Sequence, residues 1–390
     1  MATRRCLFVS CHGADLRPWN GVPFEFFSVL SQIEDITLAA PPGRVSLNNS
    51  DPTDETLYEE VKLRLQRRAR RKIAGAYTPL LRPLRLSQDY DLTVYVCQFL
   101  EEVQEIEQIE GWRERSGIAV IFLLESWTST FDDHKAEMAV LSRFDHVFVL
   151  NGSALEPMRR RVTAPVSQLS TACDTLLATP LPALPERSID MVCFGRWHED
   201  DHRDLVRYAL RDGLFYYYDV WGGLRALDWM AVRRRNADLI QRAQFYLVWA
   251  PNAWHQKWRD GTGQDHALST RYFEGAAGGA VLLGSRPHCA EFDAAFDWPD
   301  ALVPLGDDPA AAVQALRADP ARMERIRRDN IAQSLRRHDW AHRWAEMLTV
   351  LGLPLTEAHR TRLARLNLLA AQMEPAPVWG GLHLVKGETA

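Results

Sequence analysis

The chain has 390 residues, 46% of them hydrophobic and 25% charged, a composition typical of soluble globular proteins with two or three domains. A net charge of −5 gives no basic field that would favour a nucleic acid as partner. The sequence has no C-x-x-C pair among its 6 cysteines and no apolar run near the ~20 residues of a membrane span. We therefore expect a cytoplasmic protein with reduced cysteines and no zinc site.

Apolar runs in the first half predict a buried parallel sheet. The expected strands are residues 6–10, 36–39, 92–97, 118–124 and 146–150, with helices at 23–30 and 101–110. The first strand leads through a loop into a helix, which is how a Rossmann-like domain begins. That loop lacks the three spaced glycines of a dinucleotide fingerprint, so NAD is disfavoured.

Two polar features interrupt this pattern. Residues 62–72 form a basic helical segment that could rest on anionic lipid headgroups at the inner membrane face, or meet an anionic acceptor. The alternative is a solvated helix face. Glu125 follows the apolar strand 118–124 directly, at the sheet edge where open α/β folds bind their ligands.

Residues 179–187 contain three prolines and predict a linker between two halves of similar size. The second half repeats the strand and helix alternation, with a loop expected at 287–298. We expect an N-terminal domain at 1–178, a C-terminal domain at 188–351, and a last helix and tail at 352–390. The expected strands are 188–194, 214–218, 245–249, 280–284 and 301–305, and the expected helices are 202–210, 228–242, 310–318, 320–336 and 338–351.

The stretch from Ser269 to Gly284 carries the most chemistry in the second half. A helix whose first residues are Ser269, Thr270 and Arg271 offers free N–H groups, hydroxyls and a cation to an anion such as phosphate. Glu274 lies three positions after Arg271, on the same helical face, where a carboxylate could bind two vicinal ribose hydroxyls. Glycines and alanines at 275–278 would let this helix pack closely on a sheet.

This stretch resembles the Arg-x-Phe-Glu-x-x-Ala-x-Gly-Ala-x-Leu-Leu signature in the C-terminal domain of GT-B glycosyltransferases, of the family 1 and 4 type. The subgroup related to the CgeB proteins is the most similar. The resemblance implies an α/β fold of two Rossmann-like, doubly wound parallel-sheet domains facing a cleft, with the acceptor bound by the first and the nucleotide sugar by the second. It also implies that Glu274 binds the donor ribose; the alternative is a carboxylate that only caps or bridges within the helix.

The resemblance extends to further donor-binding residues. Arg196 matches the arginine that contacts the donor pyrophosphate, but the lysine expected five positions later is replaced by Asp201. Arg203 or Lys257 could supply that contact. The second glutamate of the commoner family pattern is replaced by His266, next to Asp265.

The resemblance also places residues of the first domain. The loop with His12 and Gly13 matches one that faces the cleft, although a simple turn is the alternative. A catalytic histidine found in many family members has no direct counterpart, and Glu125 or His134 would have to fill its place. Glu125 and His266 are therefore the candidate catalytic residues.

The implied activity is transfer of a hexosyl or related group from a nucleotide-diphosphate sugar to a glycan, lipid-linked glycan, protein or small molecule. The expected context is polysaccharide or glycoconjugate biosynthesis. The resemblance implies retention of configuration and no metal or other cofactor. Two alternatives share the fold: a nucleotide-sugar epimerase or hydrolase, and a non-catalytic nucleotide-sugar-binding subunit.

Overall fold

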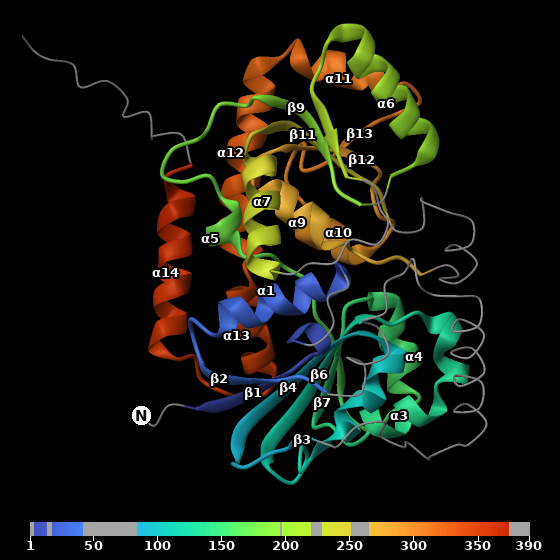
Figure 1. Cartoon of the computed structure of the whole chain (residues 1–390), viewed down its shortest axis with the longest axis vertical. Coiled ribbons are helices and arrows are strands. Elements are labelled where there is room, and N and C mark those ends of the chain that lie inside the picture. Colours follow the sequence, from blue (N-terminus) through green and yellow to red (C-terminus); the bar gives the residue numbers. More distant parts are fainter. Residues whose placement is uncertain are drawn as a thin grey trace, which may run out of the picture.

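The computed structural model describes residues 4–13, 18–41, 84–195, 197–219, 228–250 and 265–373. Most of its strands form two parallel sheets, which lie in separate halves of the molecule (Figure 1). The first-half strands are β1 (Arg5–Val9), β2 (Asp35–Ala39), β3 (Leu84–Arg85), β4 (Tyr90–Phe99), β5 (Ile109–Glu110), β6 (Ser116–Glu125), β7 (His146–Val149) and β8 (Val166–Gln168). The second-half strands are β9 (Ile189–Cys193), β10 (Tyr216–Tyr218), β11 (Ala243–Val248), β12 (Val281–Gly284) and β13 (Val303–Pro304).

The strand order is β2-β1-β4-β6-β7-β8 in the first sheet and β10-β9-β11-β12-β13 in the second, and β3 pairs with β5 apart from both. All the pairings are parallel. In each sheet the order reverses beside its first strand, which is the doubly wound topology. Together the sheets confirm the expected α/β fold of two Rossmann-like halves.

Helices cover both sheets. The first half contains α1 (Gly21–Leu30), α3 (Lys135–Leu141), α4 (Leu155–Arg159) and α5 (Thr175–Ala178), and 3-10 turns η1 (Cys11–Gly13), η2 (Pro18–Asn20), η4 (Leu100–Gln108), η5 (Thr128–Asp133) and η6 (Gly152–Ala154). The second half contains α6 (Glu199–Asp212), α7 (Trp229–Gln241), α9 (Thr270–Ala277), α10 (Ala290–Ala295), α11 (Pro309–Arg317), α12 (Pro320–Arg337), α13 (Trp340–Val350) and α14 (Glu357–Ala371).

The helix expected at 101–110 is confirmed through residue 108, as a 3-10 helix, but the prediction was wrong at its end, where Ile109–Glu110 is a short strand. The hydroxyl of Tyr95 donates to the carbonyl of Glu102 (2.6 Å), an acceptor that an α-helix would use. A second local prediction was wrong. The expected loop at 287–298 contains α10, because the ring of Phe292 packs on Tyr272 and Phe296 and fixes the segment as a helical turn.

The strands read as continuous apolar runs because both faces of each sheet are covered. Successive residues point to opposite sides, so Phe8 packs under α1 and α13 while Leu7 and Val9 face α3 and η4. In the second sheet, α9 covers one face, and α6 and α11 cover the other. A methyl group on Gly275 would overlap Tyr246 and Leu282, which confirms the expected close packing of α9 on its sheet.

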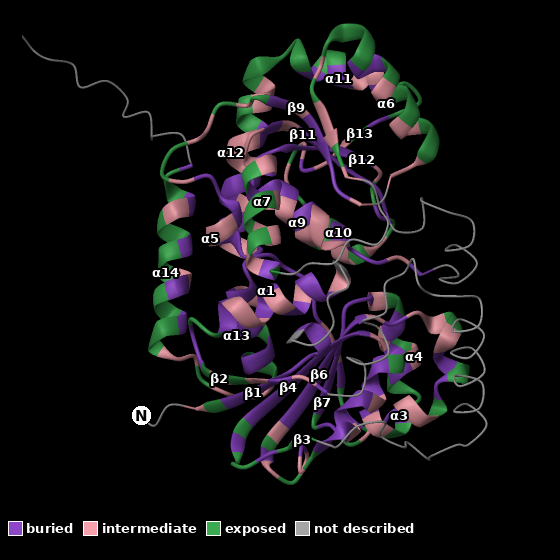
Figure 2. Ribbon diagram, viewed as in Figure 1, coloured by how far each residue is buried: buried purple, intermediate pink, exposed green. Residues whose placement is uncertain are grey.

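The C-terminal helices connect the two halves. α13 returns to the first sheet, where Trp340 stacks on Phe26 of α1 at a centroid distance of 4.6 Å. α14 packs along α12 and ends the described chain, alongside both halves in Figure 1. The buried residues in Figure 2 run through the sheets and through the contacts that α1 makes with α13 and α7. In the part of the chain that the structure describes, every helix is too short or too polar to span a bilayer.

A buried ion cluster joins this return to the end of the first half. Arg362 of α14 donates to Asp339 (2.9 and 2.8 Å), to Asp174 (2.7 Å) and to Gln32 of the first half (2.9 Å). Thr175 adds two hydrogen bonds to Asp339. Burial opposes the charge of Asp339, but Arg362 more than offsets it, so the pKa of this carboxyl is lowered. The cluster therefore fixes the segments that cross between the halves.

We expect His338 to make the protein sensitive to acid. Neither ring nitrogen of His338 has a hydrogen-bond partner among the described residues, and the ring lies among Phe273, Phe296 and Trp298. Burial, with Arg343 and Arg337 nearby, holds its pKa well below 6.5. Below pH 6.5 the unfolded chain binds a proton at His338, whereas the folded chain does not. The free energy of unfolding therefore falls as the pH drops below 6.5, by up to about 1.4 kcal/mol per pH unit.

Urea unfolding of wild type and His338→Phe between pH 7.5 and 4.5 measures this contribution. The phenylalanine variant should lose less stability on acidification than wild type. An identical slope for the two proteins would show that His338 does not contribute.

Candidate functional site

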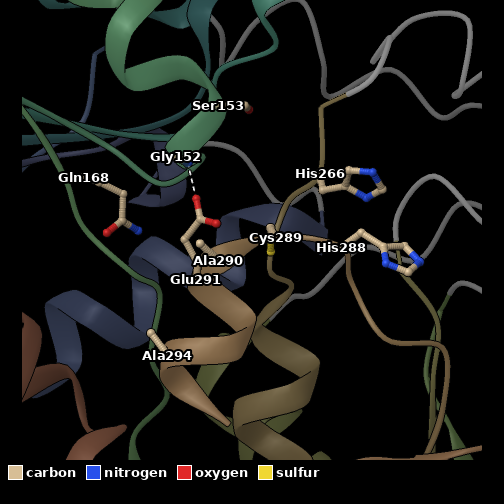
Figure 3. Close-up of a pocket in the computed structure, with 9 residues that line it drawn as sticks. All are labelled: Gly152, Ser153, Gln168, His266, His288, Cys289, Ala290, Glu291 and Ala294. Carbon is tan, nitrogen blue, oxygen red and sulfur yellow. Dashed lines mark hydrogen bonds between the residues drawn. The ribbon is translucent and has the colours of Figure 1, made fainter. Parts of the chain in front are cut away.

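The candidate site lies where the carboxyl ends of strands from both sheets meet. Residues after β7 and at the end of β8 face residues after β12 and before α9 across a pocket of about 540 Å³. The pocket is lined by Gly152, Ser153, Gln168, His266, His288, Cys289, Ala290, Glu291 and Ala294 (Figure 3). Open α/β sheets bind ligands at such carboxyl edges, so the pocket marks the interdomain cleft.

Arg271 reaches from the start of α9 to the loop after β9. Ser269 is the N-cap of α9, and its hydroxyl accepts from the N–H of Arg271. The guanidinium lies over Gly195, where a methyl group would overlap it, and Gly195 adopts a positive φ of 74°. The Nη1 group of Arg271 is buried and has no hydrogen-bond partner among the described residues. A cation therefore lies at the switch point between β9 and β11, with donor capacity left for an anion.

Glu274 forms a partly buried ion pair with Arg233 of α7. The same guanidinium lies 3.8 Å from the carboxylate of Glu25, on α1 of the first half, and Trp340 donates to Glu25 at 3.1 Å. Burial raises the pKa of the Glu25 carboxyl to about 7, with Arg233 opposing the rise and Glu274 adding to it. The carboxylate expected to bind ribose is thus oriented by an arginine that also contacts the other domain.

The two candidate catalytic residues are not brought together as one pair. Glu125 ends β6, and its oxygens accept from Gln98 (2.8 Å) and Trp127 (3.2 Å). His266 lines the pocket beside His288, with the ring centroids 5.8 Å apart (Figure 3). Asp265, the neighbour of His266 in the second half, accepts from the N–H and hydroxyl of Thr128 (2.6 and 2.8 Å) in the first.

His12 is 4% exposed, with its ring against Phe24 and Phe27 of α1. Burial lowers the pKa of this imidazole to about 4, so it is neutral at physiological pH. Gly13 closes the same short turn, η1. The pair therefore lies at the carboxyl end of β1, with the imidazole packed against aromatic rings of the same half. Arg196, Lys257 and residues 62–72, by contrast, lie outside the described residues.

Carboxylates of the described residues do not gather into a metal site: no group of three or more His, Cys, Asp or Glu among them could hold an ion. The Asp-x-Asp triplet at 89–91 lies at the amino end of β4, opposite the ligand edge. Asp91 accepts from the N–H of Arg5 and Asp89 pairs with Arg115 on the surface.

Sequence reasoning missed four residues of this region: Arg233, Gly152, His288 and Glu291. Arg233 stood in a run of three arginines with no sign of which one turns inward. Gly152 follows a predicted strand, which was a usable signal for the ligand edge. His288 and Glu291 fell in the expected loop, and only the pocket brings them to the first domain.

Comparison with known proteins agrees with this architecture. Residues 179–349 match a family described as glycosyl transferase-like. The structure is similar to an α,α-trehalose-phosphate synthase (UDP-forming) from Burkholderia vietnamiensis, with a TM-score of 0.50, 13% identity, and coverage of 90% of this chain and 100% of that one. It is equally similar (TM-score 0.50, 12% identity, 90% and 99% coverage) to an α-glucosyltransferase in complex with UDP-glucose and DNA containing an abasic site. No curated protein sequence matches the chain. The fold is therefore GT-B, and the second half carries a glycosyl transferase-like domain.

Proposed function

We propose that the protein transfers a glycosyl group from a nucleoside-diphosphate sugar to an acceptor hydroxyl. The observation that carries the proposal is Arg271, a cation at the N-terminus of α9 whose buried Nη1 has no partner among the described residues. Departure of a nucleoside diphosphate leaves negative charge on phosphate oxygens. A guanidinium and helix N-terminal N–H groups stabilise such charge without a metal.

The remaining residues extend this site. Glu274 would accept from the donor ribose while Arg233 holds one of its oxygens, and Ser269 and Thr270 would contact the diphosphate at the start of the same helix. Arg196, next to Gly195, and Lys257 would add cations. The first domain would bind the acceptor, and closure of the cleft would exclude water that could otherwise hydrolyse the donor.

Release of nucleoside diphosphate, measured with and without candidate acceptors, tests the reaction class. Acceptor-dependent release is the expected result, and the anomeric configuration of the product reports the retention that the resemblance implies. Release without any acceptor would favour the hydrolase or epimerase alternative. Donor binding without turnover would favour a non-catalytic subunit. The absence of both binding and turnover would contradict the proposal. Assays with soluble protein suit the proposed cytoplasmic location, and added anionic vesicles would test contact through residues 62–72.

Metal independence follows from the same chemistry and has its own test. Because cations of the chain would stabilise the diphosphate, we expect transfer to continue in excess EDTA at about its original rate. The control is the same assay after Mg²⁺ or Mn²⁺ is restored. Loss of transfer in EDTA with recovery on adding one of these ions would contradict the assigned phosphate site.

A further inference from the structure

The interdomain pocket contains a carboxylate that belongs to one domain and is held by the other. Glu291 is the second residue of α10, in the second half, and its Oε1 accepts from the N–H of Gly152 in the first half (Figure 3). Both residues line the pocket. A methyl group on Gly152 would overlap this carboxylate, and the φ of Gly152 lies outside the left-handed range. The glycine is therefore needed for the close approach of Glu291.

The other polar groups around Glu291 suit a neutral ligand. The described lining includes two imidazoles (His266 and His288), the amide of Gln168 and the hydroxyl of Ser153, but no lysine or arginine. Among these described lining groups, a phosphate would meet a carboxylate and no cation. Hydroxyl groups, in contrast, can donate to the carboxylate and can both donate to and accept from imidazole, amide and hydroxyl groups. The volume of about 540 Å³ lies in the range of small-molecule sites.

The pocket is also separate from the proposed diphosphate site. Arg271 reaches Gly195 after β9, whereas the pocket lies beyond β12 and against β7 and β8. Neither Arg271 nor Glu274 lines it. A ligand with a charged diphosphate and an uncharged sugar would find complementary groups in two places.

We propose that Glu291 binds a hydroxyl pair of a sugar ring in this pocket, with its orientation set by Gly152. The inference rests on the proposed function and adds a substrate-binding residue to it. The hydroxyl pair could belong to the sugar of the donor or to a sugar acceptor, and the chemistry of recognition is the same. Since Gly152 and Glu291 belong to different domains, the binding group is complete only when the domains meet.

Two variants test Glu291. Glu291→Gln keeps an oxygen for the N–H of Gly152 but loses the charge that hydroxyl donors favour. Gly152→Ala displaces the carboxylate without changing its chemistry. The matched control is Asp293→Asn on the same helix, where Asp293 pairs with Arg286 on the surface and does not line the pocket. Calorimetry with UDP, GDP, ADP and dTDP, and with their glucose or mannose conjugates, gives the affinities.

If the pocket takes the donor sugar, both variants should bind the nucleotide sugar about tenfold to a hundredfold more weakly and the free nucleoside diphosphate unchanged. If it takes an acceptor sugar, the affinities of both variants for the nucleotide sugar and for the free nucleoside diphosphate should stay at wild-type values. The KM for the acceptor should then rise about tenfold to a hundredfold. If both variants keep the wild-type donor affinity and the wild-type acceptor KM, the proposed role of Glu291 is overturned, but the proposed function is not. Failure of wild type to bind any nucleoside diphosphate would instead overturn the proposed function, and this inference with it.

Discussion

Arg362→Met should lower the free energy of unfolding by about 3–5 kcal/mol, the largest stability effect that the structure predicts for a charged residue. The variant keeps the length and apolar stem of the side chain but removes the cation between Asp339 and Asp174. The side chains of Arg362 and Asp339 are only 5% and 0% exposed, so water cannot replace the lost contacts. Two buried carboxylates would be left without their shared partner. Urea denaturation at pH 7 measures the change.

Arg360→Met on the same helix is the matched control. Arg360 pairs with Glu357, and the two side chains are 55% and 82% exposed, so the loss should stay below about 1 kcal/mol. Equal effects of the two variants would show that the buried cluster does not stabilise the return of the C-terminal helices to the first domain.

Arg271→Ala should reduce kcat/KM for the nucleotide sugar by about a hundredfold to a thousandfold, because the variant removes the proposed stabilising cation from the leaving diphosphate. Gly195→Ala should act in the same direction, since a methyl group there would overlap the guanidinium and strain a residue with φ of 74°. Steady-state kinetics and calorimetry with the free nucleoside diphosphate measure both effects.

Arg286→Ala provides the control for Arg271. Arg286 follows β12 in the same domain, but its side chain is 60% exposed and pairs with Asp293. This variant should retain wild-type kinetics. Unchanged diphosphate affinity in Arg271→Ala would remove Arg271 from the site and leave Ser269 at the helix start without its assigned role.

Much of the fold could be predicted because local patterns and tertiary packing agree. The runs at 118–124 and 245–249 are buried on both faces and form β6 and β11. Ser269 caps a helix whose small residues pack on the sheet, as the order of residues in that stretch predicts. In such segments the periodicity and the caps contain enough information.

The contacts across the cleft could not be predicted in the same way. Glu25 and Arg233 lie far apart in the chain and meet only because α1 and α7 pack against each other, and nothing local distinguishes Arg233 from Arg234. The contact of Glu291 with Gly152 likewise depends on how two domains face each other. Burial of His12 against α1 is a further tertiary effect that its loop position does not indicate.

A thermal-shift screen against UDP, GDP, ADP, CMP and dTDP and their common sugars would show whether the protein binds a nucleotide sugar. A ligand that binds only the folded protein stabilises it by about 2.7 kcal/mol at a hundredfold excess over Kd. We expect a clear increase in Tm with one nucleotide family, lost in Arg271→Ala and kept in Arg286→Ala. No shift with any nucleotide would contradict the proposed donor site, and α9 would then be only a well-packed helix of a GT-B fold.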